Sequence, residues 1–150
     1  MEFSDLAALR AAVGMDLGAS GWRTVTQDMI DGFARATGDF QWIHTDPERA
    51  RRESPTGTTL AHGFLTLSLA AVFAGELLIV HSGKMSVNYG LEQVRFTHWV
   101  PVGSQLCMKA RISACEPYQQ GVRLTLACTF FREDSPKPVC NADWVMLIFE

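Results

Sequence analysis

The stretch that decides the fold runs from Leu60 to Val80 and reads LAHGFLTLSLAAVFAGELLIV. It is strongly apolar and long enough to be mistaken for a membrane span. Polar side chains such as His62 and Glu76 interrupt it, however, and no basic clusters or aromatic belts flank it. We therefore expect a long helix, from about Gly63 to Ile79, that is buried all round by protein.

The chain after this helix changes its hydrophobic period from that of a helix to two residues, which indicates strands. The alternation predicts four consecutive antiparallel strands, over Lys84–Phe96, Ser104–Ala114, Val122–Phe130 and Val139–Phe149. Turns rich in Pro, Gly, Asp and Ser separate the four strands. This order of elements predicts an α+β protein. Both a sheet wrapped around a central helix and a generic layered arrangement fit the order.

The chain before the long helix is rich in shorter helices. Capping residues mark two of them: Thr26 precedes a helix that ends at Gly38, and Asp46 with Pro47 begins another. The expected elements are a helix over Asp5–Val13, a strand over Trp22–Val25, and helices over Gln27–Ala36 and Pro47–Arg52. The segment between the last two helices is expected to be a surface loop.

Composition limits the classes of protein to consider. The 150 residues suit one domain spanning 1–150, and 47% hydrophobic against 19% charged residues supplies a core. A net charge of −3 without a basic stripe argues against a nucleic-acid partner. The four cysteines form no CxxC pair, and the N-terminus lacks the basic region of a signal peptide. We therefore expect a cytoplasmic protein without a metal centre, whose thiols act as core side chains.

The segment from Thr37 to Pro47, TGDFQWIHTDP, carries the first chemical signal. Asp39 and His44 lie five residues apart across a bend, and a carboxylate and an imidazole brought together there can share a water molecule. Such a pair can remove a proton from the water and return one to a substrate carbon. The alternative is that Asp39 only caps a turn and His44 is an ordinary loop histidine.

The second signal is the segment TTLAHGF, from Thr58 to Phe64, at the start of the long helix. Gly63 has no side chain, so its backbone N–H can approach a ligand closely, and a helix N-terminus favours negative charge there. The amide is thus a candidate donor to a thioester oxygen that becomes enolate-like. The alternative is a tight turn into the helix, with His62 as its cap.

These segments resemble the MaoC-like dehydratases and (R)-specific enoyl-CoA hydratases. The matching runs are GDFQWIH from Gly38 to His44, AHGFLTLSL from Ala61 to Leu69, and NYGL from Asn88 with VRF and PVGS further on. Gln41-Trp42 stands where the family has Asn-Pro, which looks most like the nodulation-protein-N-like branch. The resemblance covers about residues 20–148.

The resemblance implies a hotdog fold, in which an antiparallel sheet wraps around one long central helix. It further implies a homodimer with active sites near the subunit interface, and no membrane association. Asp39 and His44 would be the catalytic pair and the Gly63 amide the carbonyl donor. The substrate would be an acyl-CoA or acyl-carrier-protein thioester of fatty acid metabolism, with no cofactor besides the coenzyme A that the substrate carries.

Five further residues are expected to contact substrate. Gln41 keeps a side-chain amide where the family has Asn, and Trp42 adds bulk that would reshape the acyl pocket. The others are His62, Ser68 and Arg95. For Ser68 a hydrogen bond to its own helix backbone is the stronger alternative, and for Arg95 a surface ion pair competes with contact to a coenzyme A phosphate.

The sequence therefore predicts reversible hydration of a trans-2-enoyl thioester to an (R)-3-hydroxyacyl thioester, with the hand of the product taken from the resemblance alone. A hotdog thioesterase is the enzymatic alternative. A non-catalytic acyl-thioester binder, or a partner subunit of a heterodimeric dehydratase, is the alternative outside catalysis. Because the chain retains both Asp39 and His44, an enzyme is favoured.

Overall fold

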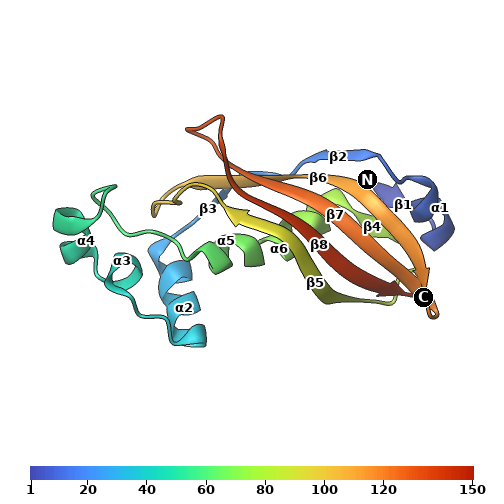
Figure 1. The fold of residues 1–150 in the computed structure, drawn as a ribbon, viewed down its shortest axis with the longest axis horizontal. Helices are drawn as coiled ribbons and strands as arrows, with labels where there is room; N and C mark the ends of the chain where they lie inside the picture. Colours follow the sequence, from blue (N-terminus) through green and yellow to red (C-terminus); the bar gives the residue numbers. More distant parts are fainter.

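A curved antiparallel sheet covers two consecutive helices, and smaller helices gather beyond one end of it (Figure 1). The computed structural model describes residues 1–150 in full. The helices are α1 (Leu6–Ala11), α2 (Gln27–Thr37), α3 (Trp42–Thr45), α4 (Pro47–Glu53), α5 (Gly63–Ser68) and α6 (Ala70–Leu77). The strands are β1 (Glu2–Phe3), β2 (Asp16–Ala19), β3 (Arg23–Thr24), β4 (Ile79–Val80), β5 (Met85–Phe96), β6 (Gln105–Tyr118), β7 (Gly121–Arg132) and β8 (Pro138–Phe149).

The four long strands lie where the period-two pattern predicts them. The sheet order is β2-β6-β7-β8-β5, with β3 also paired to β6, and every long pairing is antiparallel. Buried and partly buried residues alternate along β7, as expected for a strand with one face on the core. Strand β5 crosses over to pair with β8 and so forms an edge of the sheet.

The central helix differs from the prediction in two ways. It is divided into α5 and α6 at Leu69, where a ψ of −11° departs from the value near −42° of a regular helix. It also ends at Leu77 instead of Ile79, because Ile79 and Val80 pair as β4 with β1 in parallel. The inward face of both helices joins a core cluster of 32 buried residues, in which Phe73 is fully enclosed.

The expectation that this helix is buried all round is wrong for the single chain. Phe64 and Val72 project from α5 and α6 into solvent, because the sheet covers only one side of the helices. Neighbouring apolar residues on β5, among them Tyr89 and Leu91, are exposed as well. The chain thus carries an uncovered apolar surface along its edge strand.

Helix boundaries in the first half follow the capping signals. The Thr26 hydroxyl accepts from the Met29 amide at the start of α2, and Gly38 ends that helix in the left-handed region with φ of 80°. The Asp46 carboxylate likewise accepts from the Arg49 amide to begin α4. The loop expected between α2 and α4 is wrong in part, since Trp42–Thr45 forms the single turn α3.

The structure also bears on the state of the cysteines and on the possibility of a membrane span. All four thiols are free and buried, and burial raises the pKa of Cys128 to about 12, which disfavours the reactive thiolate. None of the helices has the length and apolar character that crossing a bilayer requires.

Candidate active site

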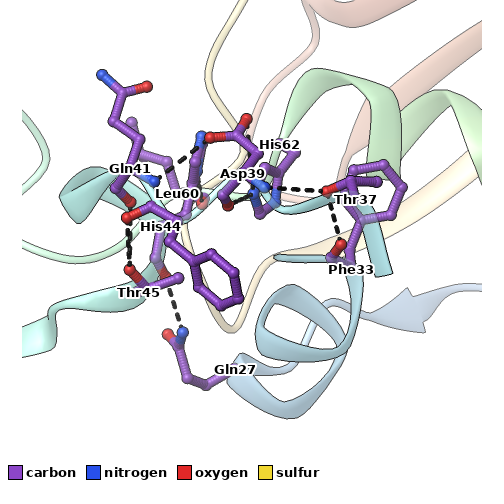
Figure 2. Close-up of polar contacts among 10 residues, drawn as sticks. Gln27, Phe33, Thr37, Asp39, Gln41, His44, Thr45, Leu60 and His62 are labelled. Atoms are coloured by element: carbon purple, nitrogen blue, oxygen red, sulfur yellow. Dashed lines mark hydrogen bonds and ion pairs between the residues drawn. The ribbon is translucent and has the colours of Figure 1, made fainter. Parts of the chain in front are cut away.

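The two segments that carry chemical signals meet in space at the end of the sheet where α2, α3 and α4 gather (Figures 1 and 2). One side-chain nitrogen or oxygen from each of Asp39, His44 and His62 lies within 4.8 Å of the others. Asp39 follows the end of α2, His44 lies on α3, and His62 immediately precedes α5. The spatial pairing of Asp39 with His44 that the sequence predicts is therefore present.

The backbone of Leu60 contacts α3 at two points. The Leu60 amide donates to the Ile43 carbonyl at 2.9 Å, and His44 Nδ1 lies 2.6 Å from the Leu60 carbonyl oxygen. Because a carbonyl oxygen can only accept, Nδ1 must carry the proton, which leaves the Nε2 lone pair of the neutral ring free. His44 is thus presented as a base at Nε2.

The surroundings of His44 keep it neutral near pH 7. Burial of the side chain, which is only 8% exposed, lowers the pKa of His44 below its ordinary value of 6.5. The hydrogen bond to Leu60 and the negative charge of Asp39 both oppose this shift, and the nearby His62 adds to it. A base that stays unprotonated at neutral pH is what abstraction of a proton from water needs.

Asp39 contrasts with His44 because its side chain is 53% exposed. Its carboxylate accepts from the Gln41 amide at 3.3 Å, which is the turn-capping contact considered as the alternative role. The same carboxylate lies 3.9 Å from His62 Nε2. Asp39 therefore makes the capping contact and also lies beside the two histidines.

A cavity of about 300 Å³ opens in front of His44. Gly63 lies on its wall, at the first turn of α5, where backbone N–H groups have no partner within the helix. A Cβ atom on Gly63 would lie 3.1 Å from the ring of Phe96, so a side chain there would have to displace that ring. The glycine thus allows Phe96 and the Gly63 backbone to form one closely packed wall.

The cavity also has walls that the sequence reasoning did not single out. Thr66 of α5 is buried in it, and Phe96, His98 and Trp99 line its mouth. His98 and Trp99 follow β5, in the segment that leads to β6. Nothing in their local pattern could have revealed this position, because it depends on the long-range pairing of β5 with β8.

A polar network behind His44 was also missed. Gln27, at the start of α2, donates from Nε2 to the His44 carbonyl at 2.8 Å and to Asp31 at 2.7 Å. The buried Thr59 hydroxyl donates to Gln27 Oε1 at 2.5 Å. One amide side chain therefore ties α2, α3 and the segment before α5 together (Figure 2).

The other expected substrate contacts do not line this cavity. Trp42 stacks instead under the Arg49 guanidinium of α4, at 4.4 Å from ring to cation, and the Gln41 side chain is directed away from His44 (Figure 2). Ser68 donates to the Phe64 carbonyl, as its alternative role predicts, and borders a neighbouring cavity. Arg95 is exposed and donates to the Val94 carbonyl.

Asp39, His44 and His62 are residue types that bind metals, and one potential ligand atom of each lies within 4.8 Å of the others. His44 Nδ1 and His62 Nε2 each face a backbone carbonyl, which leaves one free nitrogen on each ring. The two rings stack with planes only 26° apart, so their in-plane lone pairs do not converge on a common point. The geometry fits an acid–base pair better than a tetrahedral metal site.

Comparison with known proteins identifies the family of the chain. Residues 8–128 match the MaoC-like domain. The chain is 43% identical over 145 residues to 3-hydroxyacyl-thioester dehydratase Z of Mycobacterium tuberculosis, covering 96% of this chain and 95% of the relative. It is 41% identical over 146 residues to nodulation protein N of Rhizobium leguminosarum bv. viciae, covering 95% and 90%.

Solved structures show the same fold. R-hydratase PhaJ1 from Pseudomonas aeruginosa in its unliganded form superimposes with a TM-score of 0.77 at 21% identity, over 97% of this chain and 86% of the other. The (R)-hydratase from A. caviae gives a TM-score of 0.72 at 22% identity, over 89% and 94%. The chain belongs to the MaoC-like dehydratase family, and the expected hotdog fold and hydro-lyase class are confirmed.

Proposed function

We propose that this protein reversibly hydrates a trans-2-enoyl thioester to the (R)-3-hydroxyacyl thioester. The observation that carries the proposal is the orientation of His44, whose Nδ1 is fixed on the Leu60 carbonyl so that Nε2 is left free on a ring that lies close to Asp39. The names of the M. tuberculosis relative and of the R-hydratases, which describe thioester dehydration and hydration, support the same reaction. The (R) hand rests on this kinship.

The proposed step uses the three groups in a fixed order. Asp39 and His44 hold one water molecule and remove its proton as the oxygen bonds to C3 of the enoyl group. The electrons of the double bond move to C2 and the thioester oxygen, where the Gly63 amide stabilises the enolate. The proton then passes to C2, which completes the addition of water without a redox change or a further cofactor.

Part of the binding surface is proposed to come from a second copy of the chain. Strand β5 is an unpaired edge, and the apolar side chains along it and on the outer face of α5 and α6 are exposed. Soluble monomers rarely leave a long apolar edge strand open, because it would pair with other chains. A two-fold dimer that joins β5 to β5 would cover this surface. Because Phe96 of β5 lines the cavity in front of His44, the active site would lie near that interface.

The deciding experiment is an assay of the purified protein with crotonyl-CoA. We expect the absorbance of the conjugated enoyl thioester to fall and 3-hydroxybutyryl-CoA to accumulate, with no release of free thiol. Release of coenzyme A would instead identify a thioesterase, and binding without turnover of crotonyl-CoA or longer enoyl-CoA thioesters would identify a non-catalytic binder. Light scattering of the same sample at micromolar concentration tests the dimer, which a monomeric mass would refute.

A further inference from the structure

A second histidine lies directly behind the catalytic pair, and the proposed reaction gives it no step. His62 is only 3% exposed. One face of its ring stacks on His44, with centroids 3.7 Å apart, and Phe33 packs near it at 5.0 Å (Figure 2). A ring enclosed in this way has little freedom to change its orientation.

The hydrogen bonds of His62 define its tautomer. Nε2 lies 3.0 Å from the backbone carbonyl oxygen of Asp39, so it must be the protonated nitrogen. Nδ1 is buried and has no hydrogen-bond partner. A second N–H at Nδ1 would be a buried charged donor without an acceptor, which costs more than an unpaired lone pair. The contacts therefore favour a neutral ring that donates only to Asp39.

The hydrogen bond from His62 affects the position of Asp39 more than that of any other residue. The Asp39 side chain is half exposed, and it follows Gly38, whose φ of 80° makes the turn. The bond from His62 is the contact that ties the backbone of this turn to the buried interior of the site. The same ring also fixes the plane of His44 by stacking. One side chain thus touches both members of the catalytic pair.

We propose that His62 is a positioning residue for the hydration reaction: its Nε2–H holds the Asp39 backbone while its ring backs His44, so that carboxylate and imidazole face one water molecule. The inference rests on the proposed function. This positioning role differs from the substrate-binding role expected from the sequence. A positioning residue affects kcat, whereas a substrate contact that acts equally in the ground and transition states affects KM.

Two substitutions distinguish the contribution of the His62 N–H donor from that of its aromatic ring. His62→Phe keeps an aromatic ring but removes the N–H, whereas His62→Gln keeps an N–H at similar reach. We expect the Phe variant to lose at least about tenfold in kcat for crotonyl-CoA with KM within about twofold, and the Gln variant to recover most of that loss, because small misplacements of catalytic groups are costly. Val122→Ala, at a buried site on β7 that pairs with Ile148 at the opposite end of β8 from Val139 of the cavity wall, controls for lost stability alone. A raised KM with unchanged kcat, or a fully active Phe variant, would overturn the inference.

A second measurement is independent of turnover. Nitrogen-15 NMR of the imidazoles in the free protein at pH 7 should show His62 neutral, with its proton on Nε2. A charged His62, or a proton on Nδ1, would refute the proposed contact whether or not the protein hydrates crotonyl-CoA. Conversely, an inactive wild-type protein that has the expected tautomer would count against the proposed substrate or reaction and leave the hydrogen bond intact.

Discussion

The two walls of the cavity in front of His44 are built in different ways. The polar wall consists of α3 and the segment before α5, where His44 is buried and its Nδ1 meets the Leu60 carbonyl, and the buried His62 is stacked against the ring of His44. The apolar wall contains the end of β5 and the residues after it, where Phe96 and Trp99 are 44% and 59% exposed. Under the proposed function, a single chain supplies the groups for the reaction but leaves the proposed surface for the acyl group open.

The strands of the sheet show the same difference. Strand β7 alternates buried with partly buried residues, whereas β5, in the same sheet, has no buried residue. Because its apolar content resembles that of a covered strand, the proposed dimer would supply the cover that β5 lacks in the single chain. Substitutions in the polar wall should therefore change kcat, and substitutions in the apolar wall should change substrate binding and assembly.

The largest effect is expected at the proposed catalytic pair. Asp39→Asn and His44→Ala should each lower kcat for crotonyl-CoA by at least about 10²-fold, the usual scale for general acid–base groups. Because Asp39 is half exposed, its variant should unfold near the wild-type temperature, while loss of the buried His44 contact should lower Tm. Steady-state kinetics and thermal melts measure both. Turnover near the wild-type rate in either folded variant would reject the assignment.

A slightly smaller loss is expected where the two walls meet, at Gly63. Gly63→Val should reduce kcat/KM by about 10²-fold if the Gly63 amide binds the thioester oxygen, since removing such a donor costs on the order of 3 kcal/mol. Gly63→Ala should lose less, because its Cβ need only displace the Phe96 ring by a few tenths of an ångström.

A double variant separates the two reasons why position 63 requires a glycine, which are access to the amide and crowding against Phe96. If crowding against Phe96 is the whole cause, Phe96→Ala should restore the activity of Gly63→Ala. If access to the amide matters as well, recovery should be partial. A Gly63→Val protein that is folded and fully active would exclude both explanations.

The sheet could be predicted from sequence because its signals are local. Alternation along Val122–Phe130 and the turn residues before it set the strand without any knowledge of its neighbours. The caps at Thr26 and Asp46 marked helix starts for the same reason, since each cap satisfies an amide three residues away. The spacing of Asp39 and His44 suggested the pair, and the family resemblance strengthened it.

The remaining features could not be predicted because they depend on contacts distant in sequence. Gln27 meets Thr59 across 32 positions, and no pattern around Gln27 marks it as part of a site. The exposed face of α6 likewise has the composition of a buried helix, so hydrophobicity alone indicated complete burial. Only the arrangement of the sheet shows which face it leaves uncovered.

A moderate effect is expected from the edge strand. Leu91→Lys places a charge on the exposed apolar face of β5 and should convert the proposed dimer to a monomer, because burying an unpaired charge is strongly unfavourable. We expect kcat/KM to fall about tenfold, mainly through KM. Light scattering and kinetics measure the two effects. Val13→Lys, an exposed apolar residue of the region around α1, is the matched control and should remain dimeric and active.

A smaller effect is expected behind the polar wall. Gln27→Leu removes the donor to the His44 carbonyl and leaves the buried Thr59 hydroxyl without its acceptor, which should cost about 1–3 kcal/mol of stability. The turnover should fall only a few fold, because Leu60 still holds His44. Thr59→Val in the same background should regain stability by removing the stranded hydroxyl. Urea unfolding of the three variants provides the test, and an additive loss in the double variant would contradict the network.

The smallest effect concerns the dependence of activity on pH. Burial lowers the pKa of His44 below 6.5, so the neutral base should persist as the pH falls to 6.5 and be lost only below it. The acidic limb of kcat/KM should therefore lie below 6.5, and the stability contributed by the neutral ring should be lost over the same range, because the unfolded chain binds that proton first. In Asp39→Asn the negative charge that raises the pKa of His44 is gone, so an NMR titration of His44 should shift further downward. A limb at or above 6.5 would mean that water reaches His44 more freely than its buried position against Leu60 allows.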